Sequence, residues 1–195
     1  YYRSIKILQD KYTLYEANID PMLRFCHLQN ITTAGWCETK QYELIEDMSC
    51  NVDIEILIDN SKNIYGIPDE SISPLIQASF DIETYSSDGG FPDPKDDSSS
   101  VIQIATTLQV FGDPEPYKRH IITLKKCNKI EGVEVESYDR EIDVLIAWKE
   151  LLHREKIDIL IGYNIWGFDL WYMYSRAEKL NAFDFFELGK EYGKS

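Results

Sequence analysis

The stretch "ASFDIETYS" (residues 78–86) has the composition and alternation of a β-strand, with Phe80 and Ile82 as its apolar positions. Two acids, Asp81 and Glu83, stand two positions apart within it. Because side chains alternate along a strand, both carboxylates project from one face, about 6–7 Å apart along the backbone. Two like charges this close cost stability unless something neutralises them, so the pattern indicates a bound divalent cation.

Magnesium fits this pattern because it takes hard oxygen ligands, commonly one or two carboxylates together with substrate phosphates. Two such ions about 3.5–4 Å apart stabilise both oxygens of a phosphodiester displacement, and such a pair needs more than two acids. Asp169 is the candidate third acid. It follows an apolar strand and begins a helix in "IGYNIWGFDLWY" (161–172), where a negative charge is favourable.

Taken singly, each of these residues has an ordinary explanation. A D-x-E pair is common on exposed strand faces, and Asp169 alone is most simply a helix cap. Asn164 alone is a turn residue, and Phe168 alone is a core residue. The prediction therefore depends on the combination of a D-x-E strand followed by N-x-x-x-F-D at a strand-to-helix turn.

The second part of the chain has the order strand, strand, strand, helix, strand, helix. A helical crossover before the fourth strand favours a parallel placement beside an earlier strand. We therefore expect an α/β fold, a mixed sheet flanked by helices of the ribonuclease-H-like kind. The strands are expected over 75–85, 100–112, 120–126 and 157–163, and the helices over 137–156 and from 169 onward.

The first part of the chain reads as an α+β scaffold without a catalytic grouping. Asp20 can cap a helix that begins at Pro21, and β-leaning runs precede and follow it at 4–9, 12–17, 37–45 and 51–60. The segment "GIPDESISP" (66–74) is rich in turn residues and is typical of a linker. We therefore expect two domains, 1–73 and 74–195. The loop "SSDGGFPDPKDDSSS" (86–100) is long enough to be functional or disordered.

Composition narrows the class of protein. With 44% hydrophobic and 13% aromatic residues the chain can bury a core, and its net charge of −14 argues against a free-standing binder of nucleic-acid phosphates. Carboxylates that hold metals remain compatible with that charge. The four cysteines show no zinc-site spacing, and no apolar run approaches the length of a membrane span, so we expect a soluble protein of a reducing compartment. The first residue is not Met, and we expect an excerpt from a longer chain.

The combined motifs resemble a known family. "SFDIE" (79–83) is similar to the first exonuclease motif of B-family DNA polymerases, and "YNIWGFDLWYMYSRA" (163–177) is similar to the second. Other segments follow the pattern of the delta-type replicative catalytic subunit, and the resemblance runs from about Tyr12 to Gly189. These segments are "YEANIDPMLRF", "GGFPDPKDD", "VIQIA", "GDPEPY", "VESYDREIDVLIAW" and "IDILIGYNI".

The resemblance implies a 3′→5′ proofreading exonuclease domain, incomplete at its C-terminal end, preceded by part of a polymerase N-terminal domain. By this resemblance Asp81 bridges two Mg²⁺ ions, which Mn²⁺ can replace, Glu83 binds one and helps orient the attacking water, and Asp169 holds the second. Asn164 and Phe168 match positions that contact a frayed 3′ end, where aromatic stacking contributes roughly 1–3 kcal/mol per base.

Partners implied in the same way are primer–template DNA, single-stranded 3′ ends, a sliding clamp and accessory polymerase subunits, with no membrane. The expected location is the nucleus for a cellular protein and the viral replication site for a viral one. The third exonuclease motif, a Tyr and an Asp with three residues between them, has one match, Tyr65 with Asp69, which precedes the first motif and reads as chance. This motif and the polymerase palm and fingers are therefore expected outside the fragment.

Two other classes of function stay open at this point. One is a catalytically silent exonuclease-like module that braces a polymerase, which the intact acids disfavour. The other is a free-standing ribonuclease-H-like nuclease acting on RNA, which the polymerase-like N-terminal part disfavours.

Overall fold

The computed structural model describes residues 19–193, which divide into two compact units. The smaller unit combines the described part of Tyr1–Glu46 with Ile56–Ser71, and the larger combines Asp47–Glu55 with the described part of Ile72–Ser195. The strands expected over 4–9 and 12–17 lie outside the described residues.

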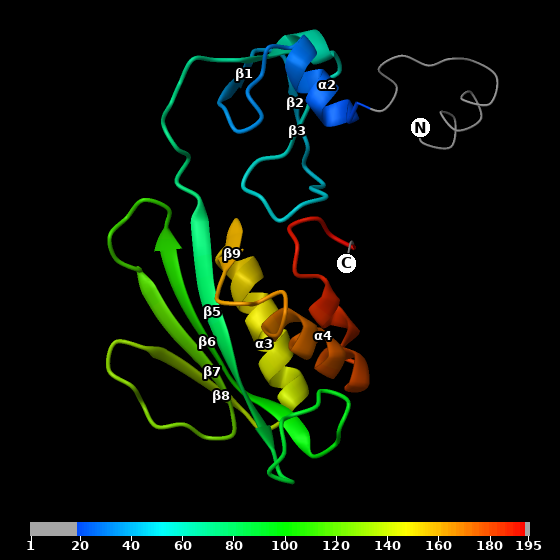
Figure 1. The fold of residues 1–195 in the computed structure, drawn as a ribbon. Coiled ribbons are helices and arrows are strands. Elements are labelled where there is room, and N and C mark those ends of the chain that lie inside the picture. Colours follow the sequence, from blue (N-terminus) through cyan, green and yellow to red (C-terminus); the bar gives the residue numbers. More distant parts are fainter. Residues whose placement is uncertain (1–18, 194–195) are drawn as a thin grey trace, which may run out of the picture. The chain divides into compact units, whose positions relative to one another are not determined.

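The elements follow one another along the chain as helices, strands and short 3₁₀ helices (Figure 1). In the smaller unit they are α2 (Pro21–Leu28), β1 (Cys37–Thr39), β2 (Glu43–Leu44), β3 (Ile56–Leu57), η1 (Ser61–Asn63) and β4 (Ile64–Gly66). In the larger unit they are β5 (Ile76–Ser86), β6 (Ser99–Val110), β7 (Lys118–Leu124), β8 (Glu134–Tyr138), α3 (Glu141–Arg154), β9 (Ile159–Ile161), α4 (Asp169–Lys179) and η2 (Phe183–Phe186). No helix among residues 19–193 is long and apolar enough to cross a membrane.

The smaller unit consists of one capped helix and two short strand pairs. The Asp20 carboxylate accepts hydrogen bonds from the backbone N–H groups of Met22 and Leu23, at 2.8 and 3.3 Å, which confirms the predicted cap of α2. β1 pairs antiparallel with β4, and β2 pairs antiparallel with β3. The strands expected over 37–45 and 51–60 are therefore present in shorter form.

The segment Asp47–Glu55 belongs to the larger unit and is hydrogen-bonded to it. The Asn51 side chain donates to the backbone carbonyl of His153 at 2.8 Å, and the Asn51 N–H donates to the carbonyl of Lys190 at 2.7 Å. The predicted boundary after residue 73 assigns this segment to the first domain. The assignment of the two parts to polymerase domains stays a prediction.

A five-stranded mixed sheet forms the body of the larger unit, in the order β8-β7-β6-β5-β9 (Figure 1). β5, β6 and β7 are antiparallel neighbours, whereas β9 runs parallel to β5 and β8 runs parallel to β7. The parallel placement of β9 after a helix is the one that the strand and helix order predicts. The ribonuclease-H-like expectation of a mixed sheet with flanking helices is confirmed.

One strand was missed, and one helix begins later than predicted. Residues 134–138 form β8, and α3 starts only at Glu141, four residues after the expected start at 137. The segment "EVESY" pairs with β7 in parallel from Glu134 to Tyr138. Its last two residues were predicted to be helical, but pairing with β7 makes them part of a strand.

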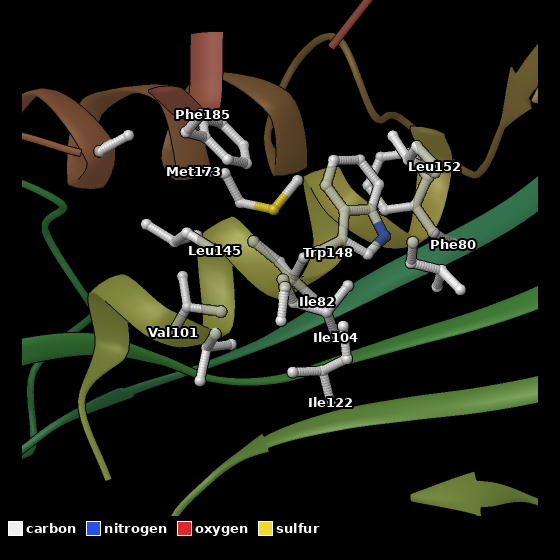
Figure 2. Close-up of a cluster of buried hydrophobic side chains, with 14 of the residues drawn as sticks. Phe80, Ile82, Val101, Ile104, Ile122, Leu145, Trp148, Leu152, Met173 and Phe185 are labelled. Carbon is white, nitrogen blue, oxygen red and sulfur yellow. The ribbon is translucent and has the colours of Figure 1, made fainter. Parts of the chain in front are cut away.

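The core lies between the sheet and the two helices on one of its faces (Figure 2). Trp148 of α3 is fully buried, and its ring packs 4.7 Å from that of Phe80 on β5, centroid to centroid. The Trp148 indole N–H donates to the Thr106 hydroxyl of β6 at 3.1 Å. Because Phe80 and Ile82 point into this core, the alternate residues of β5 are left on the opposite face.

Candidate functional site

The two acids of β5 lie on the face of the sheet away from the helices. Asp81 and Glu83 are exposed, whereas their neighbours Phe80 and Ile82 are buried under α3. Asp81 stands opposite Ala105 of β6, and the register shifts at a β-bulge directly after Glu83. Both carboxylates therefore project from one face of β5, as predicted.

The turn between β9 and α4 closes against the backbone of β5. Gly162 has no room for a side chain, since an added Cβ would lie 2.7 Å from the Phe80 carbonyl oxygen and 2.4 Å from Ile165. Asn164 has a left-handed backbone with φ of 54°, and its carbonyl accepts hydrogen bonds from the N–H groups of Gly167 and Phe168. This tight turn determines where α4 begins relative to β5.

Asp169, the first residue of α4, lies beside the acids of β5. β9 pairs with β5 only as far as Ser79, so the Ile82 N–H further along that edge has no strand partner. The Asp169 carboxylate accepts it at 3.2 Å and takes the place of the missing strand. The side chain of Asp169 is thus drawn to the Asp81 position from 88 residues further along the chain.

The environment of Asp169 disfavours its charge. Asp169 is only 3% exposed. Burial raises the pKa of its carboxyl above the usual value, hydrogen bonds from its own N–H and from the Ile82 N–H oppose that rise, and the neighbouring Asp81 adds to it. Within residues 19–193 no ion pair involves Asp81, Glu83 or Asp169. The described part of the chain therefore pairs none of its own cations with these carboxylates.

The structure brings Asp81 and Asp169 together more closely than it brings in Glu83. Among residues 19–193 the one group of three metal-binding side chains with ligand atoms within 4.8 Å of one another is a different one, described below. Glu83 lies on the same strand face, one strand position beyond the contact of Asp169 with Ile82, with its backbone opposite Gln103. The roles of the three acids as metal ligands stay predictions.

An aromatic group borders the carboxylates at the start of α4. Phe168 is partly buried, with its ring 5.5 Å from Tyr172 and 6.0 Å from Phe91, centroid to centroid. Phe91 comes from the loop that connects β5 and β6, and it is 82% exposed. Asn164 is exposed and packs against Gly167, where an added Cβ would lie 2.3 Å from its side-chain oxygen. Asn164 and Phe168 were identified from the sequence, but Phe91 was missed. The one feature that could have indicated Phe91 is its place as an aromatic residue in a Gly- and Pro-rich loop.

A cavity of about 610 Å³ opens beside Asp81 on the open face of the sheet. Its walls include Thr107 of β6, Arg119 of β7 and Tyr163 of the turn after β9. Cavities of this size accommodate ligands in many proteins. Asp81 therefore borders a recess rather than a flat surface.

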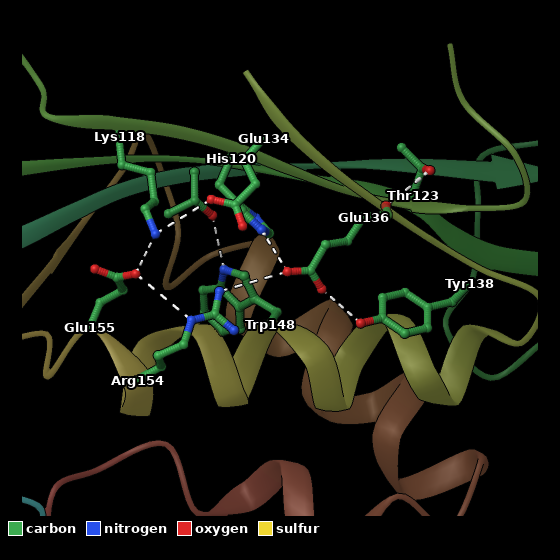
Figure 3. Close-up of polar contacts among 10 residues, drawn as sticks. Lys118, His120, Thr123, Glu134, Glu136, Tyr138, Trp148, Arg154 and Glu155 are labelled. Atoms are coloured by element: carbon green, nitrogen blue, oxygen red, sulfur yellow. Dashed lines mark hydrogen bonds and ion pairs between the residues drawn. The ribbon is translucent and has the colours of Figure 1, made fainter. Parts of the chain in front are cut away.

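A second polar cluster lies between β7, β8 and α3, and sequence reasoning did not identify it (Figure 3). His120, Glu134 and Glu136 have the ligand types of a metal site. However, Glu134 pairs with Lys118 at 3.4 Å and Glu136 pairs with Arg154 at 3.7 Å, so cations of the chain already offset both carboxylates.

The buried imidazole of His120 also disfavours a metal in this cluster. Its Nε2 lies 3.0 Å from the Glu136 carboxylate, and its Nδ1 has no hydrogen-bond partner among the described residues. An ion on Nε2 would place the proton on Nδ1, where no acceptor is available. The cluster is therefore best described as an ion-pair network that joins β7 and β8 to α3.

Comparisons with known proteins identify the family of this chain. The family model described as DNA polymerase family B, exonuclease domain matches residues 12–194. A DNA polymerase of Paramecium bursaria Chlorella virus NY2A is 41% identical over 171 residues, 87% of this chain and 18% of its own length. The DNA polymerase delta catalytic subunit of Oryza sativa subsp. japonica is 39% identical over 181 residues, 90% of this chain and 16% of its own length.

A solved structure has the same fold. The family B DNA polymerase from Pyrobaculum calidifontis superimposes with a TM-score of 0.56 at 21% identity, over 86% of this chain and 18% of that one. The chain thus spans less than a fifth of the length of these relatives. The resemblance to B-family polymerases of the delta type is confirmed. The chain belongs to the exonuclease-domain family of the B-family DNA polymerases.

Proposed function

We propose that this chain is the N-terminal and proofreading portion of a replicative DNA polymerase. In this proposal the larger unit hydrolyses the 3′-terminal phosphodiester of DNA. The observation that carries the proposal is the position of Asp169, whose carboxylate lies against β5 beside Asp81. Asp81 in turn lines a recess on the open face of the sheet. The intact family match over residues 12–194 supports the same reaction class.

The donor set fits two magnesium ions. Asp81, Glu83 and Asp169 offer hard carboxylate oxygens, and the ion pairs of the described residues leave these acids without a cation. We propose that these three acids hold two Mg²⁺ ions, with Mn²⁺ as a substitute. When bound, such ions stabilise the charge on the attacking and leaving oxygens of the phosphodiester.

The side chains of the chain have separate tasks in this reaction. Asp169 is held against β5 by the Ile82 N–H, which donates to one of its carboxylate oxygens beside Asp81. Glu83 is exposed and unpaired among the described residues, which lets its carboxylate accept a hydrogen bond from the attacking water. Phe168 and the exposed Phe91 provide faces on which the terminal base stacks, and Asn164 contacts the same nucleotide.

Selectivity for errors follows from the shape of the site. A 3′ end reaches the site only after it has separated from the template, and unpairing costs least for a mismatched base. The aromatic faces then recover part of that cost through stacking, which does not depend on the identity of the base. Mismatched ends therefore enter the site more often than matched ends.

The test compares metal binding and cleavage in matched variants. Calorimetric titration with Mn²⁺ is expected to show binding that is lost in Asp81→Ala and Glu83→Ala. Asp139→Ala, which removes a carboxylate whose side chain is 94% exposed between β8 and α3, should bind like the wild type. Equal weak binding in all four proteins would refute the proposal.

The second arm measures release of the 3′-terminal nucleotide from single-stranded DNA in Mg²⁺. The 195-residue chain is expected to degrade DNA slowly, because the third exonuclease motif is expected outside it. Addition of the downstream polymerase sequence should raise the rate, and Asp81→Ala should abolish it in both forms. Full-rate digestion by the 195-residue chain would show that the Asp of the third motif, the fourth carboxylate of the proposed site, is not needed.

The whole protein's partners and location belong to the same proposal. We propose residues 1–73 as part of the polymerase N-terminal domain and 74–195 as the exonuclease domain. The complete polymerase would bind primer–template DNA, a sliding clamp and accessory subunits. Its relatives include delta polymerases and viral polymerases, which supports replication in the nucleus or at a viral replication site.

A further inference from the structure

A buried arginine on α4 connects the site to the loop that carries Phe91. Arg176 is seven residues after Asp169, so both side chains lie on the same side of the helix. Arg176 is only 3% exposed. The Nε and Nη2 groups donate to the two oxygens of Glu141, at 2.8 and 2.5 Å, in the bidentate arrangement that is strongest for this pair.

The third nitrogen of Arg176 holds the loop of residues 87–98. Its Nη1 donates to the carbonyl of Pro94 at 3.1 Å and to that of Asp96 at 2.8 Å. Lys179, one turn later, donates to the carbonyl of Lys95 at 2.5 Å. One helix therefore anchors three consecutive carbonyls of the loop.

Glu141 fixes the arginine in turn. Its Oε1 also accepts the Val101 N–H at 2.8 Å, so that the first residue of α3 is joined to β6. Both members of the ion pair are buried, and a buried charge whose partner is removed is strongly destabilising. The anchor is thus built into the packing of α3, α4 and β6 and does not depend on a surface contact.

The other end of the same loop reaches the start of α4. Phe91 precedes the anchored carbonyls by three residues and packs its ring 6.0 Å from that of Phe168, the residue before Asp169. We propose that Arg176, held by Glu141, is a positioning residue that fixes the 87–98 loop so that Phe91 forms the second aromatic wall for the 3′-terminal base. This inference rests on the proposed exonuclease function.

The first experiment measures the loop without DNA, by amide hydrogen exchange on the 195-residue chain. Lysine at position 176 keeps the charge but cannot make the bidentate pair and both carbonyl contacts at once. Arg176→Lys should raise the exchange of Gly90, Lys95 and Ser98 on the order of tenfold. These amides donate to Asp side chains within the loop, and the amides of β7 should exchange as in the wild type.

The second experiment measures the wall itself, with a single-stranded oligonucleotide that carries 2-aminopurine at its 3′ end, in Ca²⁺ to slow hydrolysis. Phe91→Ala and Arg176→Lys are each expected to weaken binding and base quenching on the order of tenfold, the loss of one stacking contact. The double variant should lose no more than either single one, because both changes remove the same contact. Arg154→Lys, on the far side of α3, is the matched control and should bind as the wild type does.

Lys179→Gln provides a second variant if Arg176→Lys does not fold, since the Lys179 side chain is 25% exposed and its loss leaves no buried charge. Like Arg176→Lys, it should raise the amide exchange of the loop and weaken DNA binding, each by a smaller factor. Additive losses in the double variant, or reduced thermal stability with unchanged loop exchange and affinity, would overturn the positioning role. If the wild type binds no single-stranded DNA, the exonuclease proposal itself fails. If it binds and Arg176→Lys changes neither measurement, only the positioning role fails.

Discussion

Replacement of Asp169 separates its structural task from its proposed catalytic task. The carboxylate accepts the buried Ile82 N–H, and it places a negative charge beside Asp81 in a position that is 3% exposed. Asparagine keeps an acceptor oxygen for that N–H and removes the charge. Alanine removes both.

The two variants should therefore differ from each other in stability. In EDTA, Asp169→Asn is expected to unfold at higher urea than the wild type, because burial and Asp81 disfavour the carboxylate charge. Asp169→Ala leaves the Ile82 N–H without a partner, which costs about 1–3 kcal/mol relative to the Asn variant. Addition of Mg²⁺ at 100 times its dissociation constant should stabilise the wild type by about 2.7 kcal/mol and neither variant to that extent.

The pH dependence provides an internal control. The folded-state pKa of Asp169 is raised above its usual value of 3.8, so the folded wild type takes up a proton before the unfolded chain does. The advantage of Asp169→Asn is thus present at neutral pH, and it should shrink as the pH falls through that raised pKa toward about 4. Urea titrations at several pH values in EDTA measure this directly. A destabilised Asn variant at pH 7, or equal stabilisation of all three proteins by Mg²⁺, would refute the reasoning.

Two further changes test the turn and the polar network. Gly162→Ala should destabilise the domain by about 1–3 kcal/mol, because its Cβ would meet the Phe80 carbonyl and Ile165 at 2.7 and 2.4 Å. Urea denaturation measures the loss, and unchanged stability would show that the turn gives way easily. Tyr138 donates to Glu136, which together with burial raises the pKa of its hydroxyl to about 12. Its stabilising contribution is complete below about pH 10 and is lost as the pH rises toward 12, so the stability difference between the wild type and Tyr138→Phe should shrink over that range. A difference that stays constant from pH 9 to pH 12 would contradict this account.

Local sequence determined the parts of this protein whose physics is local. Strand alternation alone placed Asp81 and Glu83 on one face of β5 and Phe80 on the other, because successive side chains of a strand point in opposite directions. The Asp20 cap of α2 was equally predictable, since the capping bonds reach only two and three residues ahead. The order of strands and helices predicted the parallel placement of β9.

Tertiary structure decided the contacts whose partners are far apart in sequence. Only the early end of the β5–β9 ladder leaves the Ile82 N–H open for Asp169, and no pattern near either residue specifies where that ladder ends. The same holds for Phe91, which reaches Phe168 because the loop behind it is anchored to Arg176. Side-chain alternation acts between neighbours, whereas these contacts depend on how a folded sheet and two helices pack, which is a property of the whole domain.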